Sequence, residues 1–351
     1  MKSVLRLRLL LAVGLLAISA VLLAACGGGS GGGQGGGDGE DTGGSGGGQS
    51  GSIEIEGSST VIPITQAVAE KFNQENPDVQ IQVGGAGTGD GFEAFCGGTT
   101  QISDASRPIE ADEIKACEEK GIEFIEIPVA LDGLSVVVNT QNDFAEDITL
   151  EELKTLWEPE AEGQITQWSQ VRSEWPDEEI ALFGPGTQSG TFDFFTEFVN
   201  GEEGASRTDY QASEDDNVLV QGVGGNPNAL GYFGFSYYEN NQDTLKALAV
   251  DGVKPSADTI VSGEYPLSRP LFIYVSTKAL EEKPEVEEFV NFYLAEENLA
   301  TTVEEAQYVP MPDSLAAEAR KQFEDKTTGT VYNEDGELPN DDLETALKQS
   351  S

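Results

Sequence analysis

Four segments rich in glycine or hydroxyl side chains divide this chain, and each follows a short apolar run that predicts a β-strand. They are residues 57–60 (GSST), 84–91 (GGAGTGDG), 103–107 (SDASR) and 189–191 (SGT), and a helical pattern follows each of them. Strands that alternate with helices predict an α/β fold with a largely parallel sheet. Ligands bind such sheets at loops beyond the strand C-termini, so these four loops form the candidate site.

Strand and helix patterns alternate along most of the chain. Thr149 and Glu152 match a capping box, which predicts that a helix starts at Thr149. After residues 189–191, the helical spacing of Phe192, Phe195, Phe198 and Val199 predicts one buried face. The other expected strands are 52–56, 79–83, 101–103, 124–129, 134–139, 179–183, 229–235 and 271–276, and the other expected helices are 63–73, 111–120, 284–295 and 314–326.

The N-terminal 51 residues have the composition of a targeting segment and a tether. Three positive charges precede an apolar run over 9–25, the pattern of a secretory signal peptide. The run ends in LAAC at 23–26, which resembles a bacterial lipobox, so we expect cleavage before Cys26, its diacylation and a lipid anchor on the extracytoplasmic face of the cell membrane. The alternative is a plain transmembrane anchor with a chance cysteine. Residues 26–51, mostly glycine, predict a flexible tether.

The composition excludes several classes of function. The 351 residues contain no histidine, which removes Ser-His-Asp triads, histidine acid–base catalysis and most zinc sites. The formal net charge of −44 disfavours nucleic acid and anionic lipid as partners. We therefore expect a protein that is not an enzyme, has no cofactor or metal, and is a monomer.

Two cysteines, Cys96 and Cys117, remain in the expected folded part. An exported protein folds where disulfides persist, so we expect the two to pair across their 21-residue separation. Such a bond would contribute about 3 kcal/mol on the chain-entropy estimate. Two buried free thiols are the alternative.

The four loops together carry the donors that a tetrahedral oxyanion needs. They offer hydroxyls, backbone N–H groups, the guanidinium of Arg107 and the carboxylate of Asp104. A carboxylate beside a dianion is unfavourable unless it accepts a proton from the ligand. Because phosphate carries such a proton at neutral pH and sulfate does not, Asp104 predicts selectivity for phosphate.

Over most of residues 52–312 the chain resembles the substrate-binding lipoproteins of phosphate-specific ABC transporters, within the two-lobed periplasmic-binding-protein superfamily. The resemblance rests on GSST (57–60), GAGTGDGF (85–92), ISDASRP (102–108), GPGTQSGTFDFF (184–195), ALGYFGFSYY (229–238) and YVPMP (308–312). It implies an α/β, type II two-lobed fold that holds phosphate between the lobes and delivers it to permease subunits. By position it places these residues on the ligand: Ser59, Thr60, Thr88, Asp104, Ser189, Gly190 and Thr191.

The resemblance also implies two crossings between the lobes, for which the apolar runs 134–139 and 271–276 are the candidates. Lobe one would then comprise residues 52–135 plus 270–351, and lobe two residues 136–269. The loops at 57–60, 88 and 104–107 would face the loop at 189–191 across the cleft.

The sequence departs from the family at one place. Some members carry an arginine and an aspartate shortly before Ser-Gly-Thr, where this chain has Pro185 and Thr187. Arg107, joined by Ser106, is the candidate for the guanidinium role.

Several alternatives remain open at the level of sequence. Ser189 is also the residue type of an ordinary helix N-cap, Asp104 of a turn cap, and Arg107 of a surface ion pair. The ligand could be sulfate, molybdate or tungstate. A phosphate-ester hydrolase using Ser189 and an adhesin or sensor are the remaining functional alternatives.

Overall fold

The computed structural model describes residues 50–350 apart from 86, 334–335 and 339–341. The expected signal peptide, the lipidation site Cys26 and nearly all of the tether lie outside the described residues. Within the described part, no helix combines the length and the apolar character needed to span a bilayer.

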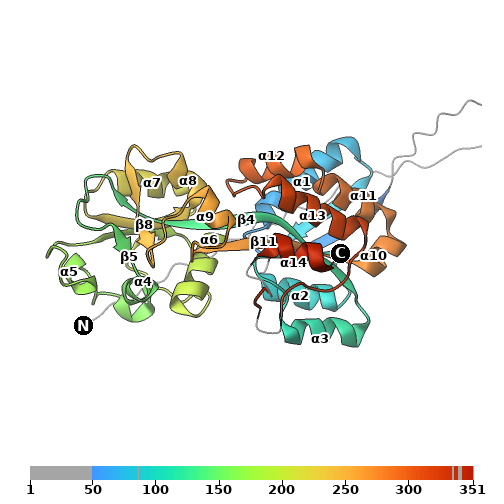
Figure 1. Ribbon diagram of the computed structural model, residues 1–351, viewed down its shortest axis with the longest axis horizontal. Helices are drawn as coiled ribbons and strands as arrows, with labels where there is room; N and C mark the ends of the chain where they lie inside the picture. The colour runs from blue at the N-terminus through green and yellow to red at the C-terminus, as the bar shows by residue number, and fades with distance from the viewer. Residues whose placement is uncertain (1–49, 86, 334–335, 339–341, 351) are drawn as a thin grey trace, which may run out of the picture. The chain divides into compact units, whose positions relative to one another are not determined.

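One set of strands, the first strand group, holds three of the four candidate loops (Figure 1). Its order is β2-β1-β3-β11-β4, with β1 parallel to β2 and β3. β11 lies between β3 and β4 and is antiparallel to both. The bounds are β1 Gly51–Gly57, β2 Val79–Gly84, β3 Ile102–Ala105, β11 Ser268–Ser276 and, within β4 (Phe124–Asn139), residues 124–133.

The second strand group continues from the same β4. Residues 134–138 pair antiparallel with β8, and β6 lies parallel between β8 and β7. β9 pairs with β4 as well, and β5 and β10 form a separate ladder. The bounds are β5 Asp147–Ile148, β6 Ala181–Pro185, β7 Gln211–Ser213, β8 Ala229–Gly234, β9 Leu245–Ala247 and β10 Ala249–Val250.

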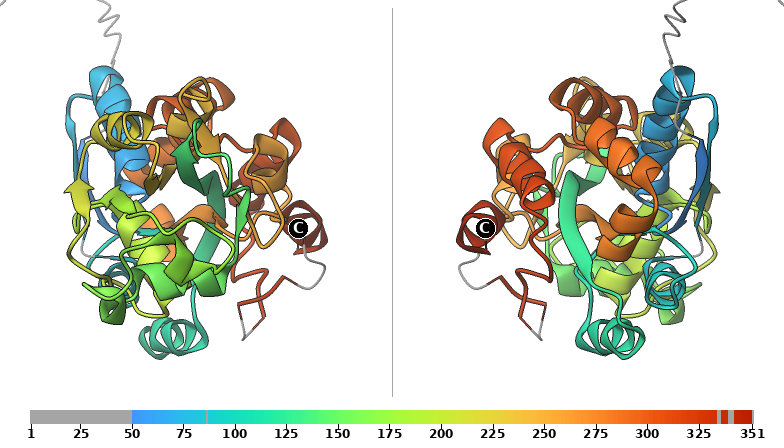
Figure 2. Two further views of the ribbon diagram at one scale, coloured as in Figure 1. Left: turned by 90° about the vertical axis from the view of Figure 1, so that its left-hand side faces the viewer. Right: turned by 90° about the vertical axis from the view of Figure 1, so that its right-hand side faces the viewer.

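Helices cover both groups. α2 packs on β1 and β3, α7 on β6 and β8, and α13 on β4, while the C-terminal helix α14 packs on α13 (Figure 2). The helices are α1 Ile62–Glu75, α2 Thr88–Cys96, α3 Ala111–Lys120, α4 Leu150–Trp157, α5 Trp168–Val171, α6 Gly190–Phe195, α7 Asp216–Gly224, α8 Phe235–Glu239, α9 Ala257–Val261, α10 Thr277–Glu282, α11 Pro284–Tyr293, α12 Glu296–Glu305, α13 Asp313–Glu324 and α14 Leu343–Ser350, with a 3-10 turn at Pro159–Ala161 and a π-helical turn at Thr196–Asn200.

The α/β fold predicted from the sequence is confirmed, with three corrections. The runs 124–129 and 134–139 are one strand, because β11 pairs with residues 124–133 and β8 takes over the pairing at Leu134 without a break. The sheet is mixed rather than largely parallel, since β4 and β11 run antiparallel to their neighbours. Phe198 is 48 % exposed and does not belong to the buried face. The π-helical turn that follows α6 rotates it outward, while Phe194 takes a buried place.

The core and the covalent crosslink hold these elements together. A single cluster of buried side chains includes Ile53 and Val68 near the first group and Trp157 and Tyr232 near the second. Cys96 and Cys117 form the predicted disulfide, which joins α2 to α3.

Candidate anion site

The loop between β1 and α1 forms one wall of a polar cavity of about 210 Å³. Ser58 lies at its base, where its N–H donates to the Asp104 carbonyl of β3 and its hydroxyl accepts from the N–H of Thr60. Backbone carbonyls satisfy the first N–H groups of α1, since Ile62 donates to Ser58 and Ile64 donates to Val61, while Pro63 has no N–H. The cavity is smaller than the ~300–1,000 Å³ of pockets for drug-sized ligands, which suits a small ion.

Thr88 and Ser106 come from two other loops and meet at the same cavity. Their hydroxyls are 3.0 Å apart, and the Ser106 N–H donates to Thr88 Oγ1. Thr88 is the first residue of α2, so the glycine loop expected at 84–91 is shorter than predicted. The cavity is lined by Ser58, Ser59, Thr60, Gly87, Thr88, Gly89, Ser106, Arg107, Glu110, Asp193, Glu197, Glu203 and Arg269.

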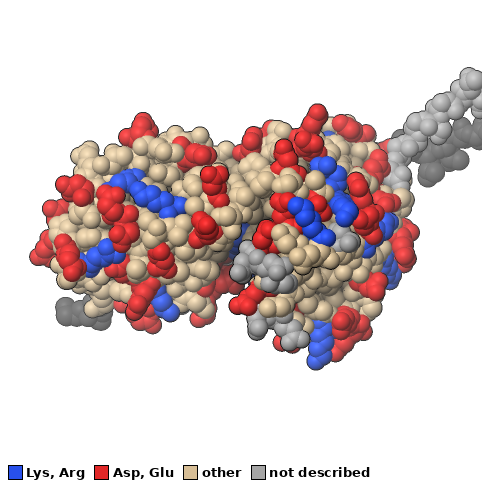
Figure 3. All heavy atoms as spheres, viewed as in Figure 1, with Lys and Arg blue, Asp and Glu red and all other residues tan. Residues whose placement is uncertain are grey.

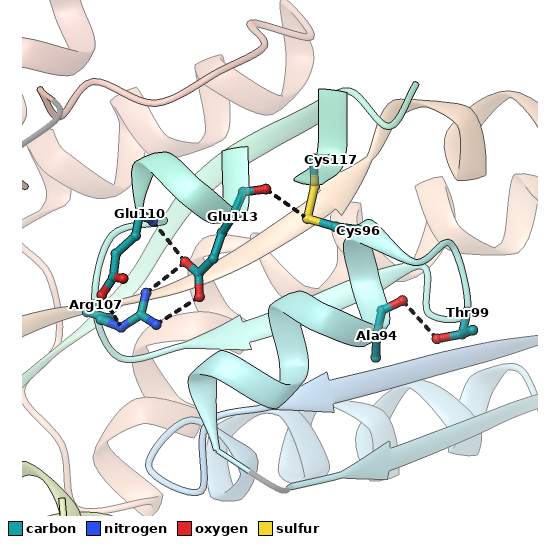
Figure 4. The surroundings of a disulfide bond; sticks show 7 residues. All are labelled: Ala94, Cys96, Thr99, Arg107, Glu110, Glu113 and Cys117. Atoms are coloured by element: carbon teal, nitrogen blue, oxygen red, sulfur yellow. Dashed lines mark hydrogen bonds and ion pairs between the residues drawn. A yellow bond between two sulfur atoms is a disulfide. The ribbon is translucent and has the colours of Figure 1, made fainter. Parts of the chain in front are cut away.

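Arg107 lines the cavity, and its guanidinium also forms ion pairs with two carboxylates outside the anion loops, those of Glu110 and Glu113 (Figure 4). Its Nη1 and Nη2 donate to the two oxygens of Glu113, at 2.9 and 2.8 Å, and its Nε lies 3.2 Å from Glu110. Glu113 lies on α3, one turn before the disulfide residue Cys117. The surface ion pair that the sequence left open for Arg107 is therefore present, and most of its positive charge is compensated.

Asp104 lies beneath the loops rather than in the cavity wall. Its carboxyl group is fully buried on β3, where Oδ1 accepts from the hydroxyl of Thr65 at 3.0 Å, and Oδ2 has no hydrogen-bond partner among the described residues. The Thr65 hydroxyl also lies 3.2 Å from that of Tyr293. Burial raises the pKa of Asp104 to about 8, against which the Thr65 hydrogen bond acts.

The loop at 189–191 lines a neighbouring cavity of about 420 Å³, and Ser59 lines both this cavity and the one described above. Ser189 is the N-cap of α6, since its hydroxyl accepts from the N–H of Thr191. Gly190 lies against the β1–α1 loop so closely that a Cβ there would come within 2.2 Å of Thr60 Oγ1. Only glycine permits this approach of the two backbones.

Two charged residues that the sequence analysis did not single out complete the site. Asp193 of α6 accepts from the hydroxyl of Ser59 at 2.9 Å, and burial raises the pKa of its carboxyl group. Arg269 of β11 donates through Nη2 to Thr60 Oγ1 at 3.0 Å and to the Gly190 carbonyl at 3.4 Å. Its guanidinium also lies over the ring of Phe194, 4.0 Å from the ring centre. Arg269 thus lies between the β1–α1 loop and the loop at 189–191, and it lines the same cavity as Arg107.

Each of the two omissions had a signal in the sequence. Asp193 interrupts an otherwise aromatic run, TFDFF, four residues after Ser189, where it returns to the same helix face. Arg269 stands immediately before the apolar run 270–275, so its charge had to be placed at the end of a buried strand.

The electrostatics of the cavity are mixed. The guanidinium groups of Arg107 and Arg269 share its wall with four carboxyl groups, those of Glu110, Asp193, Glu197 and Glu203. On the face drawn in Figure 3, acidic side chains are scattered over a mostly uncharged surface, with Lys and Arg in fewer groups among them. Within the described ranges, no group of three His, Cys, Asp or Glu side chains could hold a metal ion. The cavity wall therefore combines hydroxyl and guanidinium donors that suit an anion with carboxyl groups that repel one.

Comparison with known proteins shows the family to which the chain belongs. A family model described as "PBP superfamily domain" matches residues 42–297. The phosphate-binding protein PstS of Staphylococcus haemolyticus is 40 % identical over 310 residues, which cover 87 % of this chain and 93 % of that protein.

Two solved structures are similar as well. One is a possible phosphate binding protein from Planctomyces limnophilus, with a TM-score of 0.75, 46 % identity and coverage of 79 % of this chain and 99 % of that one. The other is an ABC-type phosphate transport receptor from Vibrio cholerae, with a TM-score of 0.60, 27 % identity and coverage of 74 % and 100 %. The chain belongs to the PBP superfamily and, within it, to the family that includes the PstS proteins.

Proposed function

We propose that this protein captures inorganic phosphate outside the cytoplasm and delivers it to the permease of an ABC transporter. The observation that carries the proposal is the small cavity in which hydroxyls from separate loops meet the guanidinium of Arg269. The names of its relatives, a phosphate-binding protein and a phosphate transport receptor, support the same ligand and the same type of partner. The role is binding rather than catalysis.

We propose that the ligand lies between two lobes, residues 52–135 plus 270–351 and residues 136–269. The change of β4 partner from β11 to β8 near residue 133 supports a boundary there. Ser59, Thr60, Thr88, Ser106 and Arg107 would contribute from lobe one, and Ser189, Gly190 and Thr191 from lobe two. An anion that binds both sets of loops favours closure, because only the closed state makes all of these contacts.

Asp104 would supply the selectivity. In its ionised form, which a pKa of about 8 favours at alkaline pH, its unpartnered Oδ2 is an acceptor that a protonated phosphate oxygen satisfies and a sulfate oxygen does not. Arg269 would provide the positive charge that the loop at Pro185 and Thr187 lacks.

We further propose that Cys26 carries the lipid anchor and that the protein acts as a monomer at the extracytoplasmic face. Labelling with a radioactive fatty acid, with Cys26→Ser as the control, tests the anchor. Size-exclusion chromatography with light scattering tests the oligomeric state.

Isothermal titration with phosphate, sulfate and molybdate tests the function. At pH 9, where Asp104 is charged, we expect binding of phosphate but not of sulfate or molybdate. In Arg269→Gln we expect phosphate affinity to fall about 100-fold, the scale of a charge-assisted hydrogen bond to an anion. Arg172→Gln, which removes an arginine paired with Glu152 away from the cavity, is the matched control. Equal heats for phosphate and sulfate would contradict the proposal, and hydrolysis of a chromogenic phosphate ester would favour the hydrolase.

A further inference from the structure

Arg269 of β11 and Asp132 of β4 face each other where the first strand group meets the second. They are register partners in the β11–β4 ladder, and Arg269 Nε lies 3.3 Å from Asp132 Oδ2. The side chains are 11 % and 4 % exposed, so the pair is shielded from solvent. One residue beyond Asp132, at Gly133, the β11 ladder ends, and the β8 ladder begins at Leu134.

The same guanidinium reaches both sides of the candidate site. Nη2 donates to Thr60, from the loop before α1, and to the Gly190 carbonyl at the start of α6, while the guanidinium carbon lies over Phe194 of α6. Arg269 therefore has three kinds of contact at once, with β4 through Asp132, with the β1–α1 loop and with α6. A guanidinium carries five N–H donors in a fixed plane, so Nε can stay on Asp132 while the outer donors face an anion.

We propose that Asp132 is a positioning residue that fixes the Arg269 guanidinium at the crossing strands, and that this pair couples phosphate binding to the relative movement of the two strand groups. The inference rests on the proposed function. An anion bound to Arg269 contacts a side chain that Asp132 fixes to β4, next to the point where the pairing of β4 changes from β11 to β8. Rotation at the crossing then moves Thr60 and Gly190 relative to one fixed donor group.

A double-mutant cycle tests the proposal by titration calorimetry with inorganic phosphate. Asp132→Asn removes the anchor, and we expect affinity to fall about tenfold, within the usual range of pairwise coupling energies. Arg269→Gln lowers affinity further. The double variant should match Arg269→Gln alone within about twofold, because Asp132 acts through Arg269.

Small-angle X-ray scattering supplies a readout that a purely structural role would not move. The unmodified protein should become more compact on addition of phosphate, and Asp132→Asn should show a smaller change even at saturating phosphate. Asp209→Asn is the matched control, since Asp209 also pairs with a buried arginine, Arg207, but lies outside the cavity lining. If Asp132→Asn fails to fold, Asp132→Glu keeps the charge and displaces the carboxylate, and a loss of affinity is still expected.

The outcomes distinguish failure of the Asp132–Arg269 coupling from failure of phosphate binding itself. If the unmodified protein binds phosphate and the two losses of affinity multiply in the double variant, Asp132 does not act through Arg269 and the inference is wrong. Unchanged phosphate affinity in Asp132→Asn would also show that the inference is wrong. If the unmodified protein binds no phosphate, the proposed function fails, and this inference fails with it.

Discussion

The buried carboxyl group of Asp104 makes the stability of the ligand-free protein depend on pH in a predictable direction. Its pKa is about 8 in the folded protein, against 3.8 for an unperturbed aspartate. Between these values the folded state keeps a proton that the unfolded state has released. The free energy of unfolding therefore falls as pH rises through this window, by up to 1.4 kcal/mol per pH unit.

The perturbation that isolates this effect is Asp104→Asn. The asparagine oxygen still accepts from Thr65 but does not titrate, so the variant should lose the pH dependence that Asp104 causes. From pH 5 to pH 8 we expect the variant to gain about 4 kcal/mol relative to the unmodified protein, which is three units at about 1.4 kcal/mol each. Any constant cost of the substitution cancels in this difference.

Urea unfolding at pH 5 and pH 8 without phosphate measures the difference in free energy of unfolding between Asp104→Asn and the unmodified protein. Fluorescence of the buried Trp157, Trp168 and Trp175 is the signal. The exposed Asp78→Asn is the matched control for the loss of one carboxylate. A difference between Asp104→Asn and the unmodified protein that stays constant within about 1 kcal/mol, the size of an ordinary point-mutation effect, would refute the reasoning.

Four further outcomes follow from the same contacts. Sulfate should compete with phosphate more strongly at pH 6 than at pH 9, because Asp104 is neutral at the lower pH and charged at the higher one, and Asp104→Asn should remove this trend in competition calorimetry. Thr65→Val should raise the pKa of Asp104 further, since it removes a hydrogen bond that stabilises the carboxylate; a shift of the stability profile toward lower pH would contradict this. Gly190→Ala should weaken phosphate binding at least about tenfold, because its Cβ would meet Thr60 at 2.2 Å, whereas Gly224→Ala, with its nearest contact at 3.4 Å, should bind normally. Cys96→Ala/Cys117→Ala should lower the free energy of unfolding by about 3 kcal/mol, measured by urea titration against the oxidised protein, and an unchanged midpoint would count against a structural role of the disulfide.

Local pattern was sufficient to predict the elements whose cause is local. The helix expected at 111–120 matches α3 (Ala111–Lys120), and the capping box at Thr149 is present as predicted. Both follow from short-range signals: helical spacing and a side chain that caps its own backbone. The disulfide was predictable from export and the presence of two cysteines.

Features that depend on distant partners could not be predicted in this way. The continuity of β4 depends on β11 and β8, which lie more than 90 residues further along the chain. Arg269 reaches Thr60 across 209 positions, and nothing in the sequence near either residue indicates that they meet. For Arg107 the sequence suggested both a ligand role and an ion pair, and the choice depends on Glu113, whose direction is set by α3.

The position of β11 has a consequence for how the chain acquires its fold. This strand is inserted between β3 and β4, although it follows them by more than 120 residues. During synthesis or export, β3 and β4 therefore emerge with facing edges that have no partner until residue 276 is free. Such edges are templates for association with other chains. The first strand group cannot be completed until the second has emerged, so nascent chains need protection until residue 276 of 351, about four fifths of the sequence, has appeared.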